Sequence, residues 1–581
     1  MKALFSALHH AYFRNFESVV RELAARGHQV HLAADEPEDL GGQELAERLA
    51  RECPDLVTWG FSPSLEHEPW FETARKLRQG LDYARMMQPR YSASPKLRVR
   101  AESRAPRIVR WAARTPRVGP RLALATLTRL ERLLPRAEAM VEYLRAHAPD
   151  IVVLASLTYS RSQQLDMLKA ARVLDIPVAA AIMSWDHLSS KALLHIAPDM
   201  VLVWNEMQKH EAIDMHGLPS DRIVTTGAQC YDQWFARSPH RSREEFCRAM
   251  GLRADRPFAL WVHSTFSPAP EVPESTLVTQ WIEALRSSSD PCLRDLGVLV
   301  RPHPERIKEW AGVDLARYEN VAFHGRNPID VDAKNDYFDS LYHSSAVIGL
   351  VTSAFLEAAI VGRSVLTLIL PAYRMHQQEM LHFRYLMEVE GGLLHAASDM
   401  ETHLTLLSTA VAGRGRDQRN RRFLQAFVRP SGLDVPATPV FADALERLQR
   451  EGARADPSLE SASWVRGLVG ALAGQTHWRI GRWLLNDPRE DAWDADRERK
   501  QEFWDERHRA KVDRERHRHA DREARLRRHH AVQRRKGLAR AWRRGRHSMK
   551  MVVLSVLQKS RPSRDAVRRL FAFAGMRRSG R

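Results

Sequence analysis

The sequence is poor in cysteine and contains no long apolar run. No two of its four cysteines have Cys-x-x-Cys spacing, so the sequence indicates neither a zinc site nor a disulfide framework. We therefore expect a protein of a reducing compartment, the cytoplasm. No segment approaches the roughly 18 apolar residues of a membrane-spanning helix. The apolar stretch of the opening MKALFSALHH is too short for a signal peptide.

Metal-binding patterns are scarce as well. An Asp-x-Asp pair at the end of a strand would suit a metal–diphosphate complex, but the pairs at residues 330–332 and 494–496 lie in polar segments. The C-terminal histidines are interspersed with arginine, which disfavours a metal site. We therefore predict neither a bound metal nor a resident cofactor.

Positive charge, in contrast, is abundant and unevenly distributed. The formal net charge is +18; residues 489–581 hold 30 Lys and Arg against 13 Asp and Glu, and residues 75–136 hold 17 against 3. Such basic segments suit an anionic partner. Near the C-terminal end the apolar run MKMVVLSVL follows WRRGRH, a pattern typical of an interfacial helix. We expect residues 489–581 to hold the protein on the inner face of an anionic membrane; RNA binding or a disordered solubilising tail are the alternatives.

The body of the chain alternates between strand and helix patterns, which predicts parallel α/β sheets covered on both faces. In residues 1–235 strands are expected at 3–8, 29–34, 150–155, 177–183, 199–204 and 222–226, with helices at 162–174 and 206–215. The basic segment 68–136 breaks this alternation and is predicted to be a helical insertion.

A second series of strands and helices begins near residue 257. Strands are expected at 258–263, 297–300, 321–324, 346–351 and 364–370, with helices at 276–286, 336–342 and 354–361. We predict two Rossmann-like domains, at residues 1–235 and 236–450, that face a cleft across a hinge at 227–244. Residues 451–581 are expected to form a basic helical or disordered tail.

The most specific motif is Arg301-Pro302-His303-Pro304, which directly follows an expected strand. The prolines cannot extend a strand ladder and favour extended backbone at Arg301 and His303. Both side chains then lie at the carboxyl end of a strand, where open parallel sheets bind their ligands. Arginine suits phosphate recognition, and histidine can donate to phosphate. We predict that both bind the phosphates of a nucleotide; a rigid strand exit with two solvated side chains is the alternative.

Two hydroxyl-rich segments follow other expected strands. Thr352 and Ser353 precede the helix expected at 354–361, and a helix N-terminus attracts phosphate; an ordinary N-cap is the alternative. At the end of the strand at 258–263 stand three further polar residues that are predicted to meet a diphosphate through hydroxyl and backbone N–H groups. They are His263, Ser264 and Thr265.

Two stretches resemble the GT-B glycosyltransferases over about residues 1–430. The stretch LAARGHQV is similar to the Arg-Gly-His with which the first helix ends in many of these enzymes. The stretch SAFLEAAIVGRSVLT, with Gly362 and Val365 in place, is similar to their Ser-x-x-x-Glu-Ala motif followed by Gly-x-x-Val. The resemblance implies that Glu357 binds the ribose of the nucleotide, and it agrees with catalysis without a metal.

The chain also resembles the CDP-glycerol glycerophosphotransferases and related bacterial surface-polysaccharide transferases, which share the His-Pro motif and the hydroxyl pair. That group carries an acidic residue before the hydroxyls, whereas this chain has Leu350 and Val351. We therefore favour a sugar nucleotide over a glycerophosphate donor.

The candidates for a general base lie in the first half. His9 and His10 end the first expected strand, where inverting GT-B transferases often place a histidine that takes a proton from the acceptor hydroxyl. His10 is the first choice, and a solvated loop histidine is the alternative. Asp186, which follows another strand, is the second candidate, or a partner that orients a histidine.

These observations predict a glycosyltransferase that moves a sugar from a nucleotide-activated donor to a surface glycan or a lipid-linked acceptor. A sugar-nucleotide epimerase and a glycerophosphotransferase are alternatives on the same fold. A non-catalytic scaffold that binds nucleic acid is the alternative from a different class, because the tail combines arginine and histidine with Trp504 and Trp542.

Overall fold

The computed structural model describes residues 1–474, except 39, 93, 115–117, 156, 160–161, 267–269, 271, 326–327, 329, 414–418 and 456–462, and in addition residues 484–485 and 569. Residues 1–492 form one compact unit and residues 493–581 a second. Nearly all of the basic tail, with its predicted membrane or RNA contacts, thus lies outside the described residues.

The N-terminal half is built on a parallel seven-stranded sheet with the order β3-β2-β1-β4-β5-β6-β7. Its strands are β1 (Lys2–Ala7), β2 (Gln29–Ala34), β3 (Val57–Phe61), β4 (Ile151–Leu154), β5 (Val178–Ala181), β6 (Met200–Val203) and β7 (Ile223–Thr225). Six of them coincide with predicted strands. The sequence pattern missed β3, a half-exposed edge strand without a continuous apolar run.

The C-terminal half has a parallel six-stranded sheet with the order β10-β9-β8-β11-β12-β13. Its strands are β8 (Phe258–Val262), β9 (Gly297–Arg301), β10 (Val321–Phe323), β11 (Ala346–Ile348), β12 (Ser364–Leu368) and β13 (Leu394–Ala397). Only β13, a four-residue edge strand, was not predicted. The predicted fold class, two Rossmann-like α/β domains, is confirmed.

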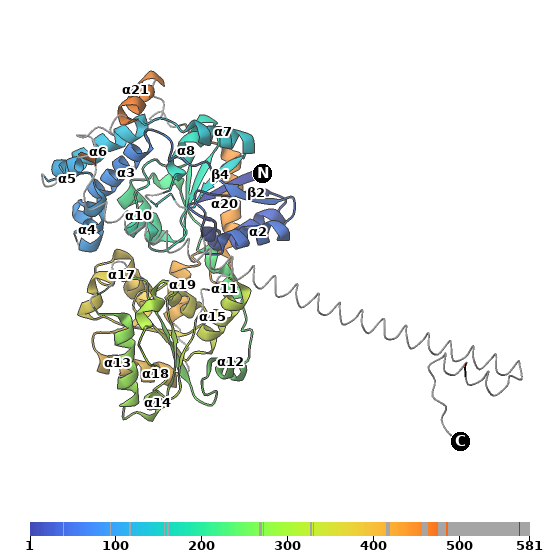
Figure 1. The fold of residues 1–581 in the computed structure, drawn as a ribbon, viewed down its shortest axis with the longest axis vertical. Helices are drawn as coiled ribbons and strands as arrows, with labels where there is room; N and C mark the ends of the chain where they lie inside the picture. Colours follow the sequence, from blue (N-terminus) through green and yellow to red (C-terminus); the bar gives the residue numbers. More distant parts are fainter. Residues whose placement is uncertain are drawn as a thin grey trace, which may run out of the picture. The chain divides into compact units, whose positions relative to one another are not determined.

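Helices cover both sheets (Figure 1). In the N-terminal half they are α1 (Glu17–Ala25), α2 (Gly42–Glu52), α7 (Glu138–His147), α8 (Gln164–Val173), α9 (His187–Ser190), α10 (Glu206–His216) and α11 (Asp232–Ala236). In the C-terminal half they are α12 (Arg243–Met250), α13 (Glu274–Arg286), α14 (Pro291–Arg294), α15 (Val331–His343), α16 (Ala354–Ile360), α17 (Leu381–Glu388), α18 (Met400–Ala412) and α19 (Arg419–Phe427). Short 3-10 helices add η1 (His10–Asn15), η2 (Pro89–Tyr91), η3 (Ser220–Arg222), η4 (Gln229–Tyr231), η5 (Pro304–Trp310), η6 (Pro371–His376) and η7 (Val389–Gly391).

The basic segment between β3 and β4 forms the predicted helical insertion. Its helices are α3 (Phe71–Met86), α4 (Pro95–Arg104), α5 (Arg107–Ala112) and α6 (Val118–Leu133). The central helix α3 packs against α4 and α6. The insertion thus surrounds α3 with helices that carry many arginines.

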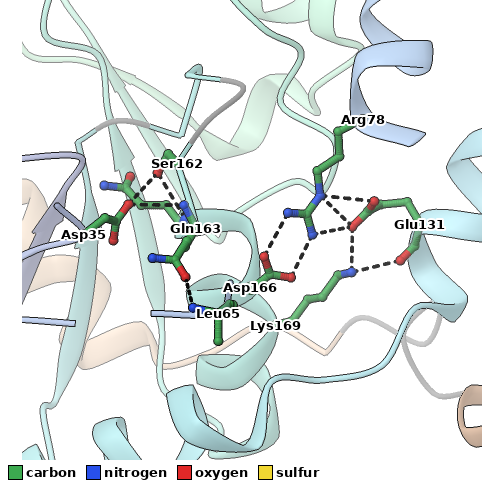
Figure 2. Close-up of polar contacts among 9 residues, drawn as sticks. Asp35, Leu65, Arg78, Glu131, Ser162, Gln163, Asp166 and Lys169 are labelled. Atoms are coloured by element: carbon green, nitrogen blue, oxygen red, sulfur yellow. Dashed lines mark hydrogen bonds and ion pairs between the residues drawn. The ribbon is translucent and has the colours of Figure 1, made fainter. Parts of the chain in front are cut away.

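A buried ion network fastens this insertion to the sheet domain. Arg78 of α3 donates to both oxygens of Asp166 on α8, at 2.8 and 2.7 Å, and reaches Glu131 of α6 at 3.1 Å. Lys169 of α8 donates to the same Glu131 at 2.6 Å. Figure 2 shows Arg78 between the two carboxylates. Two cations and two carboxylates balance each other, as a buried network requires.

Two C-terminal helices return to the N-terminal half. Helix α20 (Ala437–Glu451) lies in the N-terminal half (Figure 1). It packs on α1, with Phe441 against Phe16 at 6.0 Å between ring centroids. Helix α21 (Ser463–Gly474) contacts α3 and α6. The sequence-based division assigned α20 to the C-terminal domain and α21 to the tail. Helix α20 has an apolar face that is buried on the N-terminal half, which local sequence does not reveal.

Candidate functional site

A cavity of about 610 Å³ is lined by residues of both halves. In each sheet the chain reverses its direction of growth once, between β1 and β4 and between β8 and β11. Open parallel sheets bind ligands at such points, beyond the carboxyl ends of the strands. The loops that follow β5, β8, β9 and β11 all contribute to the cavity wall. Its volume falls in the range of small-molecule sites.

Arg301 and His303 both line this cavity, as predicted. Arg301 is the last residue of β9 and is only 5% exposed. Its guanidinium lies over the ring of Tyr337 on α15, 5.1 Å from the centroid. The contact with the ring restricts the conformations of the guanidinium, so that Arg301 loses little conformational entropy when it binds a ligand.

Thr352, Ser353 and Glu357 line the cavity next to Arg301. Ser353 occupies the N-cap position of α16 but makes no side-chain cap bond, whereas the Thr352 hydroxyl accepts from the N–H of Ala354 at 3.3 Å. The exposed Ser353 hydroxyl is therefore not used as an ordinary cap.

The surroundings of Glu357 shift the pKa of its carboxyl group. The Tyr337 hydroxyl donates to its carboxylate. Burial raises the pKa of Glu357 to about 7, although Tyr337 and Arg14 act in the opposite direction. The carboxyl group therefore changes charge near neutral pH, which is common for residues of functional sites.

The loop after β8 contributes in two ways. His263 and Thr265 line the cavity, whereas Ser264 is fully buried. The Ser264 hydroxyl accepts from the N–H of Val351 at 2.9 Å, and its own N–H donates to Glu274 at 2.9 Å. Ser264 thus connects the loops after β8 and β11 without lining the cavity itself. Burial lowers the pKa of His263 to about 4, against the opposing effect of Glu309, so its imidazole is neutral at pH 7.

Asp186 is the one candidate base that lines the cavity. Its carboxylate accepts from the hydroxyls of Ser184 at 2.6 Å and Ser190 at 3.0 Å, and the Lys191 ammonium lies 3.9 Å away. Burial alone would raise the pKa of Asp186, but Lys191 and nearby imidazoles outweigh burial and hold it below its usual value. Asp186 therefore remains a carboxylate throughout the neutral range.

Neither His9 nor His10 belongs to the lining of this cavity. His10 is 1% exposed and packs edge-on against Trp59 and Phe61 of β3, at 5.4 and 4.9 Å. His9 stacks on Tyr12 at 4.2 Å. Burial lowers the pKa of His10. The chain turns into η1 directly after β1, and this turn directs His10 into the core.

No protein-family profile and no curated sequence matches this chain. Solved structures do match. A glycosyltransferase from Rickettsia africae is 11% identical, with 80% of this chain and 99% of that chain covered and a TM-score of 0.44. A UDP-GlcNAc 2-epimerase from Neisseria meningitidis bound to UDP-GlcNAc is 13% identical, with 77% and 100% covered and a TM-score of 0.44. An Anabaena protein, HepE, in complex with UDP-glucose is 11% identical, with 77% and 100% covered and a TM-score of 0.41.

Two parallel Rossmann-like sheets contribute to one cavity, and a C-terminal helix returns to the first half. The architecture is of the GT-B type. Within it the predicted phosphate and ribose residues come together on the C-terminal wall, and Asp186 lies on the N-terminal wall.

Several cavity residues had no signal in the sequence analysis. They are Arg14, Lys96, Arg100, Lys191, Tyr337, His376 and His382. Lys96 and Arg100 are four residues apart and therefore share one face of α4. That spacing could have separated them from the other basic residues of the insertion. Tyr337 and His382 lie within helices, where nothing local distinguishes them from packing residues.

Among the described residues no group of three or more His, Cys, Asp or Glu is arranged to hold a metal ion. In the same part of the chain no helix is long and apolar enough to cross a membrane. Metal-independent chemistry stays a prediction.

Proposed function

We propose that this chain is a glycosyltransferase that transfers a sugar from a nucleotide-activated donor to a glycan or lipid-linked acceptor. The observation that supports it is the shared cavity, whose lining includes the side chains predicted to bind phosphate and ribose on one half and the Asp186 carboxylate on the other. A donor and an acceptor can then meet in one site.

The donor side is assigned to the C-terminal half. Arg301 and His303 bind the diphosphate, together with Ser353 and the loop at Thr265. Glu357 accepts hydrogen bonds from the ribose hydroxyls. Tyr337 donates only one hydrogen bond to this carboxylate, which can accept several more. The positive charge of Arg301 also stabilises the leaving diphosphate as the glycosidic bond to it breaks.

The acceptor side is assigned to the N-terminal half. Asp186 accepts the hydrogen of the acceptor hydroxyl and takes its proton as the new glycosidic bond forms. Ser184, Ser190 and Lys191 hold the carboxylate in place. His187, whose pKa burial lowers to about 4, adds a neutral ring beside it.

The test is titration of the full chain with nucleoside diphosphates of different bases. Arg301→Ala and Glu357→Ala should each weaken binding of the preferred nucleotide by about 1.5–3 kcal/mol, the usual cost of a lost charged hydrogen bond. Arg421→Ala is the matched control, because Arg421 is exposed on α19 and does not line the cavity. Unchanged affinity in both cavity variants contradicts the donor assignment.

Incubation with the matching nucleotide sugar then separates the enzyme classes. A glycosyltransferase releases nucleoside diphosphate in proportion to added acceptor. An epimerase changes the sugar while it stays nucleotide-linked and needs no acceptor, and a scaffold does neither. Either of the last two outcomes contradicts the proposal.

A further inference from the structure

The cavity holds more positive charge than a nucleotide donor requires. Its lining includes seven Lys or Arg side chains but only two carboxylates. The cations are Arg14, Lys96, Arg100, Lys191, Arg237, Arg301 and Lys334, and the carboxylates are Asp186 and Glu357. Lys334 is neutralised by Glu17 outside this set, at 2.8 Å. A surplus of several charges still remains.

Part of this surplus is concentrated on the N-terminal wall. Lys96 and Arg100 are adjacent on one face of α4, and Lys191 directly follows α9. Arg100 donates to the carbonyl oxygen of Ser190, the residue before Lys191. Burial, and then the charges of Arg100 and Lys191, lower the pKa of Lys96 to about 8. Neighbouring positive charges repel each other, and a bound anion removes this repulsion.

The protein supplies too little negative charge to balance this cluster. Asp186 lies 3.9 Å from Lys191 and already accepts from two serine hydroxyls. Arg100 donates to the carbonyl oxygen of Ser190, a neutral acceptor. Arg100 also interacts electrostatically with Asp82, which does not line the cavity and accepts from the N–H of Leu193.

The cluster receives its remaining contact from the C-terminal half. The Lys96 ammonium lies 2.7 Å from Nδ1 of His376 at the end of η6. Burial, and then Lys96 and Arg306, lower the pKa of His376 to about 4, so the ring is neutral and accepts the hydrogen bond. A neutral ring positions the ammonium but does not cancel its charge.

An aromatic ring lies beside one of the three cations, Lys191. Lys191 lies over the ring of Tyr159, 5.6 Å from its centroid, and the largely buried Trp185 also lines the cavity. Aromatic rings near a cation suit a charged group attached to a sugar or an apolar chain.

We propose that Lys96, Arg100 and Lys191 form a subsite for a phosphate group of the acceptor substrate. The inference rests on the proposed function, because it assigns the N-terminal wall to the acceptor. A phosphate monoester or diphosphate carries two or more negative charges, which match a cluster with a surplus of about two, whereas one carboxylate is usually matched by a single arginine. The acceptor is thus an anionic, phosphorylated glycan or lipid-linked sugar.

The probe is inorganic pyrophosphate, titrated calorimetrically into the full chain at about 0.15 M salt, where weak surface attraction is screened. We expect a site that Arg301→Ala removes and a second site that the Lys96→Met/Lys191→Met double variant removes. The double variant should weaken the second site by about a hundredfold, roughly tenfold for each charge. Arg129→Met is the control, because Arg129 is exposed on α6 outside the cavity.

Proton uptake provides an independent readout. A bound phosphate raises the pKa of Lys96, so wild type should take up more protons, or release fewer, than Lys96→Met when pyrophosphate binds at pH 8.5. A merely structural lysine does not produce such a signal. Thermal unfolding of each variant confirms that it is folded.

The outcomes separate this proposal from the proposed function. If the wild-type chain shows the second site but no site that depends on Arg301, the donor assignment is contradicted and the subsite stands. Wild-type pyrophosphate binding in the double variant overturns the subsite, as does a single site that both sets of substitutions abolish. Malonate, a dicarboxylate, tests whether the second site prefers phosphate. If malonate binds there as tightly as pyrophosphate, the assignment of a phosphate group is wrong.

A second probe identifies the source of the phosphate. Geranyl diphosphate that binds the second site more tightly than pyrophosphate supports a lipid-linked acceptor. Equal affinity of the two probes supports a phosphate on the glycan itself. The same double variant should remove the binding of either probe.

Discussion

At the scale of single residues, Glu357 shows how burial changes the chemistry of a motif. The sequence placed a glutamate after a hydroxyl pair, but its contact with Tyr337 and its pKa of about 7 come from the fold. Around it stand Tyr337, Arg14 and Cys230, of which only Arg14 carries charge at neutral pH.

This pKa predicts a pH dependence of nucleoside binding. The carboxylate form, which prevails above about pH 7, accepts stronger hydrogen bonds from the ribose than the protonated form. Affinity for the free nucleoside, which has no titrating phosphate, should therefore fall about fivefold between pH 8 and pH 6, a loss of about 1 kcal/mol. Calorimetry on wild type and Glu357→Gln measures it. The same dependence in Glu357→Gln would assign the effect to another group.

His10 and Asp186 should separate into a structural and a catalytic role. His10→Phe keeps a ring against Trp59 and Phe61 and should retain turnover, whereas His10→Ala opens the core and should lower the free energy of unfolding by about 1–3 kcal/mol. Asp186→Asn should lower turnover by roughly 10²–10⁴-fold with nucleotide affinity unchanged. A large loss of turnover in a stable His10→Phe variant would instead restore His10 as the base.

At the scale of elements, the buried network of Arg78, Glu131, Asp166 and Lys169 decides how the insertion is attached (Figure 2). Burial alone would raise the pKa of Glu131, but Arg78 and Lys169 outweigh burial and lower it to about 2. The network links α3 and α6 of the insertion to α8 of the sheet domain.

Glu131→Gln should therefore be strongly destabilising, by about 3–5 kcal/mol, because it leaves buried cations short of a partner. The pKa of Glu131 lies below its unfolded value of 4.5. Its stabilisation is thus present above pH 4.5 and is lost as pH falls toward 2. Denaturant unfolding between pH 7 and pH 3 measures both effects. The exposed Glu138 supplies the control, Glu138→Gln, and equal stability of the two variants would show that the network contributes little.

At the scale of the whole molecule, the excess charge belongs to two segments of the chain. Residues 489–581 hold 30 of the 89 Lys and Arg, and the insertion brings Lys96 and Arg100 into the cavity. The two basic segments therefore serve different purposes in our proposals. We propose that the insertion, with Lys191, binds a phosphate of the substrate, and we expect the C-terminal region to attach the protein to a membrane.

The membrane proposal predicts that truncation after residue 488 abolishes binding to anionic vesicles. Each basic side chain near anionic lipid contributes about 1 kcal/mol, screened by salt, so the full chain should co-sediment with such vesicles and dissociate as salt rises. Neutral vesicles are the control. Equal binding by both forms contradicts the proposal, and tight binding to RNA with none to vesicles favours the nucleic-acid alternative.

Local sequence determined the elements of this protein and the positions of several site residues. Apolar periodicity predicted most strands, since each buries its side chains whatever its partner. Prolines after β9 placed Arg301 and His303 at a strand end, because the missing N–H and the restricted backbone are properties of the motif itself. The edge strands β3 and β13 escaped this reasoning, since Thr58 and Gly60 in β3 and His395 in β13 interrupt the apolar pattern.

Only the tertiary structure decided which of these residues meet. Lys96 and His376 are separated by 280 residues, yet they share a hydrogen bond. The turn after β1 directs His10 into the core, although its position at a strand end resembles that of Asp186. A sequence pattern reports whether a side chain is buried or exposed along its own element. Which remote side chain it faces depends on how the two sheets and their crossing helices pack, and that packing is a property of the whole chain.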